Sequence, residues 1–244
     1  MSTTTLSRST IRSASQRFVA GDQIARTDRD YPLSQFLLKP LAAQFADMLV
    51  ATAVRPVHVT ILGATFAMTA AVFVGMSLGP MSVAAILVLA AWFCDRLDGE
   101  LARRQGTASA WGAWLDANLD ELGDLGIHTA IAAAAALQWG ASWPWGLLIA
   151  FVAGKYLFIY GLTAEANSAS KQGPTISNST GSPRSLIREL YHLPANADVR
   201  AHVLMLTLAW NALAFELAWV ALYYNARWIA RYILVARRLR EVPR

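Results

Sequence analysis

The chain is short of cysteine and of charge. A single cysteine, Cys94, among 244 residues cannot form an internal disulfide, which excludes a disulfide-stabilised scaffold. Charged residues make up 15% of the chain and hydrophobic residues 55%, a balance that is typical of membrane proteins. Residues 1–50 also lack a compact apolar core followed by a small-residue cleavage site, so we expect no signal peptide.

The formal net charge of the chain is +5. A basic balance is common in proteins that bind nucleic acid. Here, however, the lysines and arginines cluster beside apolar runs, as they do in the cytosolic loops of membrane proteins. We therefore expect membrane lipids, and no nucleic acid, as partners.

Four aspartates lie between two long apolar runs: Asp95, Asp98, Asp116 and Asp120. Acidic residues within such runs are costly to bury and by default mark a functional site. On helices, the first two aspartates share one face and the last two share another. Two helices that meet at these faces gather four carboxylates, which repel one another unless cations intervene. Oxygen ligands favour Mg²⁺ or Mn²⁺.

The same stretch follows the pattern D-x2-D-G-x2-A-R-x8-G-x3-D-x3-D. This pattern resembles the signature of the CDP-alcohol phosphotransferase family, which consists of integral membrane enzymes of phospholipid and related phosphodiester synthesis. All eight signature residues are present: Asp95, Asp98, Gly99, Ala102, Arg103, Gly112, Asp116 and Asp120. The resemblance implies metal-dependent transfer of a substituted phosphate group from a CDP-alcohol to a hydroxyl acceptor, with release of CMP.

The resemblance also implies roles for single residues. Asp95, Asp98 and Asp116 are expected to be the main ligands of two Mg²⁺ or Mn²⁺ ions. Asp120 is expected to be the general base and a further metal contact.

The CDP moiety is expected to contact small or basic signature residues and one residue outside the signature: Gly99, Ala102, Arg103, Gly112 and Thr60. The family often has an asparagine where this chain has Val57, which changes one part of the nucleotide contact. His58, the next residue, is a candidate substitute.

The family has a cationic pocket that can hold the phosphate of an acceptor, and Lys155 and Arg200 are the candidates for it here. Lys155 lies inside an apolar run, where a charge is costly. The alternative interpretation is that both residues only set the orientation of the chain in the membrane.

The substrates stay open at this point. The donor is CDP-diacylglycerol or a CDP-linked polar alcohol such as CDP-inositol. The acceptor is glycerol phosphate, serine, inositol phosphate or a lipid hydroxyl. Two hypotheses from other classes are a cation transporter, which would have acids near mid-span on several helices, and a catalytically silent membrane scaffold.

The predicted architecture is all-α, with six transmembrane helices and an amphipathic juxtamembrane helix. We divide the chain into a flexible cytosolic tail, an interfacial helix, a six-helix domain and a basic tail: 1–30, 31–54, 55–238 and 239–244. The predicted spans are 57–79, 81–104, 109–137, 145–164 and two within 199–238, with a polar loop at 165–200. For 199–238 the alternative is one span followed by a surface helix.

Basic and neutral loops alternate along the chain, which places both termini and the aspartates on the cytosolic side. We therefore expect an integral protein of the cell inner membrane. Homodimers are common in the family, so the resemblance adds a second copy of the chain as an expected partner.

Overall fold

The computed structural model describes residues 36, 38–171 and 197–241, and within these residues every regular element is a helix. The predicted all-α class is therefore confirmed. The proposed tail 1–30 and most of the predicted loop 165–200 lie outside the described residues.

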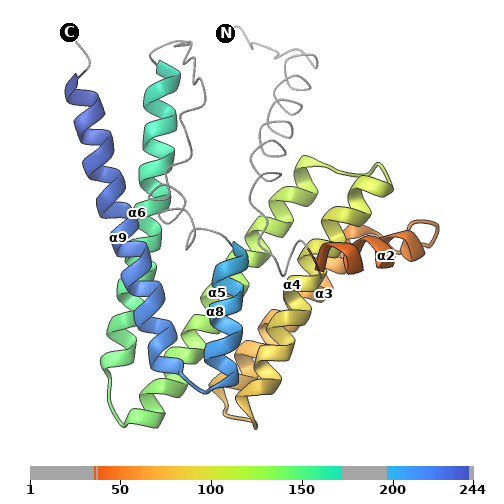
Figure 1. The fold of residues 1–244 in the computed structure, drawn as a ribbon, viewed down its shortest axis with the longest axis horizontal. Coiled ribbons are helices and arrows are strands. Elements are labelled where there is room, and N and C mark those ends of the chain that lie inside the picture. The colour runs from red at the N-terminus through yellow and green to blue at the C-terminus, as the bar shows by residue number, and fades with distance from the viewer. Residues whose placement is uncertain (1–35, 37, 172–196, 242–244) are drawn as a thin grey trace, which may run out of the picture.

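Seven helices are described (Figure 1): α2 (Lys39–Leu49), α3 (Pro56–Gly75), α4 (Met81–Arg104), α5 (Ala110–Trp139), α6 (Trp143–Lys171), α8 (Ala197–Ala209) and α9 (Leu213–Glu241). The observed bounds of α4 are those predicted for the second span. α6 is longer than predicted and continues through residues 165–171, which were assigned to a loop. α9 likewise continues to Glu241, into the predicted basic tail.

Local sequence signals explain several helix ends. α3 begins at Pro56, whose fixed φ suits the first helical position. The Arg55 amide donates to Nδ1 of His58 at 3.2 Å, so His58 caps the start of α3. α5 begins after Ser109, whose hydroxyl accepts the amide of Gly112 at 3.1 Å, and it ends at Gly140 with φ 59°.

The amphipathic segment predicted at 31–54 contains α2, which spans Lys39–Leu49 and ends before the predicted end at residue 54. Residues 31–35 and 37 lie outside the described residues. In α2, Ala42 and Ala46 are buried, whereas Phe45 and Met48 are exposed. The small residues allow close packing on α4, and an ion pair between Asp47 and Arg104 joins the two helices. Placement of the exposed apolar face in a membrane interface stays a prediction.

Two described helices are long and apolar enough to cross a membrane, at Pro56–Gly75 and Trp143–Ala164. The apolar part of α8, Val199–Ala209, is shorter. α4, α5 and α9 combine apolar stretches with ionisable residues, which lowers their mean hydropathy. The count of six spans therefore stays a prediction.

The helices form two groups, which are joined by contacts of α5 with α6 and α9 and by α8 (Figure 1). α3, α4 and α5 pack together, and α6 lies beside α9. α8 packs on α4 and also contacts α9. The core between these groups combines alanines with large side chains such as Phe151, Ile131 and Leu217. A cavity lies between the two groups.

Gly63 sets the distance between α3 and α4. A Cβ added there would lie 2.9 Å from Cβ of Cys94 and 3.4 Å from the carbonyl oxygen of Ala91. Cys94 is buried at this contact and packs between the two helices. The helices can therefore approach this closely only with a glycine at position 63.

We predict that Gly63→Ala lowers the thermal midpoint of the detergent-solubilised protein, because overpacking of a tight contact costs about 1–3 kcal/mol. Gly146→Ala is the control, since a Cβ at Gly146 would meet no atom within 4 Å. A midpoint for Gly63→Ala that equals the control's would contradict this account of the α3–α4 contact.

Candidate active site

Three of the four signature aspartates converge. Asp95 and Asp98 on α4 and Asp116 on α5 each offer a carboxylate oxygen, and these atoms all lie within 4.8 Å of one another. The convergence follows from the i, i+3 spacing on α4 and from the tight turn between α4 and α5. Asp120 lies one turn beyond Asp116 and lines the same cavity.

Thr60 of α3 lies at this cluster. Its hydroxyl donates to Oδ2 of Asp98 at 2.5 Å, and Asp98 is 6% exposed. A buried carboxylate needs hydrogen-bond donors, and Thr60 supplies one from a third helix. The sequence assigned Thr60 to the CDP moiety, and the structure places it at the wall of the aspartate cavity.

The aspartates line one end of a cavity of about 260 Å³. Gly63, Ala64 and Ala67 of α3 form part of its wall, where small side chains leave room. The opposite wall includes Arg200 and Leu204 of α8. The cavity thus lies between the two groups of helices.

Four of the predicted nucleotide contacts are not among the residues that line this cavity: Gly99, Ala102, Arg103 and Gly112. They lie where α4 ends and α5 begins. Arg103 donates to Oε2 of Glu100 at 2.5 Å, and its side chain is 57% exposed. Their contact with a nucleotide stays a prediction.

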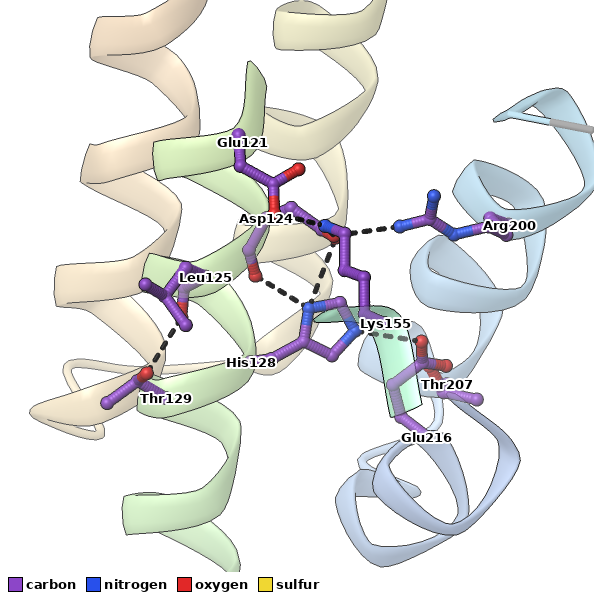
Figure 2. Close-up of polar contacts among 9 residues, drawn as sticks. All are labelled: Glu121, Asp124, Leu125, His128, Thr129, Lys155, Arg200, Thr207 and Glu216. Carbon is purple, nitrogen blue, oxygen red and sulfur yellow. Dashed lines mark hydrogen bonds and ion pairs between the residues drawn. The ribbon is translucent and has the colours of Figure 1, made fainter. Parts of the chain in front are cut away.

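The two predicted acceptor residues come together at one carboxylate, that of Asp124 (Figure 2). Lys155 of α6 and Arg200 of α8 both contact Oδ2 of Asp124, the arginine at 2.9 Å. Nζ of Lys155 also lies 2.8 Å from Oε1 of Glu121. Lys155 is only 9% exposed, so these carboxylates compensate a buried charge.

The sequence analysis missed two further arginines, on α9. Arg227 donates to the hydroxyl oxygen of Tyr223 at 2.5 Å, and its guanidinium lies 4.1 Å from the ring centre of Phe158. Arg231 lies 6.0 Å from the same ring. Their i, i+4 spacing in an otherwise apolar helix is the signal that marks one shared face.

The sequence analysis also missed three buried polar side chains near Asp124. His128 and Glu216, each 2% exposed, line the cavity, and Thr207 is 5% exposed. Asp124 follows Asp120 by four residues on α5 and so continues the face of the last two signature aspartates. The four residues come from α5, α8 and α9 and form one connected set (Figure 2).

Comparison with known proteins gives a match of residues 53–236 to the model of the CDP-alcohol phosphatidyltransferase family. A phosphatidylinositol phosphate synthase of Cutibacterium acnes is 50% identical over 40 residues, which are 16% of this chain and 19% of the relative. One of Streptomyces avermitilis is 38% identical over 80 residues, which are 33% of this chain and 32% of the relative. The archaetidylinositol phosphate synthase of Methanothermobacter thermautotrophicus is 34% identical over 93 residues, which are 38% of this chain and 46% of the relative.

The chain therefore matches less than half the length of each of these curated relatives. A solved structure with a similar fold is that of Mycobacterium tuberculosis phosphatidylinositol phosphate synthase with CDP-DAG bound. It has a TM-score of 0.56 and 20% sequence identity, and the likeness covers 79% of this chain and 92% of that chain.

We predict that Asp124→Leu lowers the free energy of unfolding by about 3–5 kcal/mol, because it leaves the buried Lys155 and the partly buried Arg200 without their shared carboxylate. Thermal or denaturant unfolding in detergent measures the effect. Asp47→Leu is the control: it removes an ion pair whose carboxylate side chain is 71% exposed, for which about 0–1 kcal/mol is expected. Equal losses in the two variants would contradict the structural role of Asp124.

Proposed function

The chain belongs to the CDP-alcohol phosphatidyltransferase family, and we propose that it transfers the phosphatidyl group of CDP-diacylglycerol to a hydroxyl acceptor and releases CMP. The observation that carries the proposal is the convergence of Asp95, Asp98 and Asp116 at one end of a cavity that Asp120 also lines. Such an arrangement on two adjacent helices favours a transferase over a cation transporter, whose acids would be spread along several helices.

A divalent metal fits the donor set at this end of the cavity. Three carboxylate oxygens within 4.8 Å of one another are hard ligands of the kind that Mg²⁺ and Mn²⁺ prefer. We assign Asp95, Asp98 and Asp116 as the main ligands of two ions, with Asp120 as a further contact. The ions would neutralise the donor's phosphates and stabilise the charge on the leaving CMP.

The reaction is an exchange at the phosphorus that carries diacylglycerol. The hydroxyl oxygen of the acceptor forms a bond to this phosphorus. The bond between the same phosphorus and the phosphate oxygen of CMP breaks. The proton of the hydroxyl moves to the Asp120 carboxylate, and CMP leaves with the bonding electron pair. Asp120 suits this role because it lines the cavity beside the three ligands.

An apolar groove beside the cavity supports a lipid-linked donor over a CDP-linked polar alcohol. The groove and the cavity share Ala64 and Leu119. The remaining lining residues of the groove are Ile61, Thr65, Met68, Thr69 and Val72. Both threonine hydroxyls donate to carbonyl oxygens of their own helix, so the groove surface is effectively apolar. An acyl chain can leave the cavity along it.

The cations on α6, α8 and α9 support an acceptor with an anionic group. Lys155 and Arg200 meet beside the cavity, and Arg200 lies 5.3 Å from the ring of Tyr224. Arg227 lies 5.4 Å from the neighbouring ring of Tyr223. We assign Lys155 and Arg200 to the acceptor's phosphate, with Arg227 and Arg231 as further contacts. The relatives are named as synthases of inositol phosphate lipids, which agrees with this acceptor class.

We also place the protein in the cell inner membrane, with six spans and with both termini and the aspartates on the cytosolic side. The support is the alternation of basic and neutral loops together with the apolar helices. A homodimer is part of the same proposal.

Turnover tests the roles of the aspartates. We expect purified protein to release CMP from CDP-diacylglycerol only with Mg²⁺ or Mn²⁺ and an acceptor. Asp120→Asn should lower kcat by about 10²–10⁴-fold, the usual contribution of a general base, and Asp95→Asn should also raise the metal concentration required. Asp47→Asn is the control and should keep wild-type rates. Full activity of Asp120→Asn would contradict its assignment as the base.

The groove gives a second prediction. Thr65→Phe fills it and should raise the KM for a long-chain donor by about tenfold, which corresponds to the lost burial of about two CH₂ groups. The KM for a dibutyryl donor should not change. Thr163→Phe is the control, because Thr163 is exposed on α6 and its hydroxyl also bonds to its own helix. Equal effects on both donors would exclude the groove as the acyl site.

A further inference from the structure

A chain of polar side chains extends from the carboxylate of Asp124, which both cations contact, through His128 and Glu216 to Thr207 (Figure 2). The Thr207 hydroxyl lies 2.9 Å from Oε2 of Glu216, and Oε1 of Glu216 lies 3.4 Å from Nε2 of His128. Nδ1 of His128 lies 2.7 Å from the carbonyl oxygen of Asp124 and 3.3 Å from its Oδ1. The chain connects α8, α9 and α5.

The hydrogen-bond chemistry fixes how His128 is held. A carbonyl oxygen only accepts, so Nδ1 of His128 carries a proton and donates to Asp124. The contact between Nε2 and Glu216 then needs one further proton, on either the ring or the carboxyl group. His128 therefore has a partner on both sides, and packing against Phe151 at 4.7 Å between ring centres limits its rotation.

This arrangement uses the two oxygens of Asp124 for different purposes. Oδ1 faces His128, whereas Oδ2 receives both Lys155 and Arg200. The two cations come from different helices, α6 and α8, and their shared contact sets the distance between them. A lysine has three N–H donors and an arginine five, so donors remain for an anion after both have bound Asp124.

We propose that Glu216, His128 and Thr207 are positioning residues of the acceptor subsite. Through Asp124 they hold Lys155 and Arg200 close enough together to bind one phosphate group. The inference rests on the proposed function, because it concerns the anion subsite assigned there. None of the three residues belongs to the aspartate signature, and their effect is on affinity for the acceptor rather than for the donor.

The position of the chain supports this assignment over a purely structural role. The cavity is lined by Asp124, His128, Glu216 and Arg200. The residues proposed to hold the two cations in place therefore lie directly against the space where the substrates meet. Among the proposed metal ligands, Asp116 lies about three helical turns before His128 on α5, so the metal site and this chain occupy different parts of the cavity. Loss of these contacts should therefore separate Lys155 from Arg200 and leave the binding of the donor at the aspartates unchanged.

Two pairs of variants test the inference in the full-length protein, with inorganic phosphate as the probe of the acceptor subsite and CMP with Mg²⁺ as the probe of the donor end. Glu216→Leu should raise the phosphate Kd by about tenfold or more, whereas Glu216→Gln keeps a hydrogen-bonding group for both neighbours and should stay within about threefold. Thr207→Val should raise the Kd by about threefold. Thr129→Val is its matched control, because the exposed Thr129 hydroxyl donates to the carbonyl oxygen of Leu125 in its own helix (Figure 2).

The CMP Kd should stay within about twofold of wild type in all four variants. Parallel weakening of phosphate and CMP binding in Glu216→Leu would show a general structural role and overturn the inference. An unchanged phosphate Kd in that variant, or no phosphate binding by wild type, would overturn it as well. None of these results bears on the proposed transfer reaction. If that reaction were wrong, the wild-type protein would neither bind CMP with Mg²⁺ nor release CMP from the donor.

Discussion

The cost of burying charge in a largely apolar helical bundle is the constraint on which the rest of the structure depends. The chain meets it in two different ways. Carboxylates of α4 and α5 gather at one end of the cavity, where Thr60 hydrogen-bonds the most buried of them. On the other side of the cavity, Lys155 and Arg200 are compensated by Asp124. The aspartate cluster thus needs bound cations to offset its charge, whereas the contact of Lys155 and Arg200 with Asp124 already contains both signs of charge.

This division of charge matches the division of the helices. α3, α4 and α5 supply the aspartates and the small residues of the cavity wall, and α3 and α5 also form the adjacent apolar groove. α6, α8 and α9 supply the basic side chains and their aromatic neighbours. The proposed donor and acceptor therefore meet where the two groups of helices face each other. Asp124 belongs to α5 but pairs with cations of α6 and α8, so it joins the two groups electrostatically.

Features determined by short stretches of sequence were predicted well. The spacing of Asp95 and Asp98, the bounds of α4 and the start of α5 after Ser109 all follow from helical periodicity and capping. The helix predicted at 31–54 ends at Leu49, five residues before the predicted end. α6 extends into the predicted loop because polar residues can continue a helix once its apolar part is packed.

Contacts between distant segments were beyond the sequence analysis. His128 and Glu216 are 88 positions apart, and no periodic pattern in either helix indicates that they meet. Arg227 and Arg231 were missed because an aromatic neighbour that they share, Phe158, comes from α6. The roles of Lys155 and Arg200 were suggested by resemblance, but their shared contact with Asp124 depends on how three helices pack.

The most direct test of the central claim is an experimental structure of the protein with Mn²⁺ and CDP-diacylglycerol, in which the anomalous signal locates the metal. The account predicts Mn²⁺ between Asp95, Asp98 and Asp116, with the donor's pyrophosphate in the cavity and an acyl chain along the groove between α3 and α5. Manganese bound away from these aspartates, or a donor outside the cavity, would contradict it.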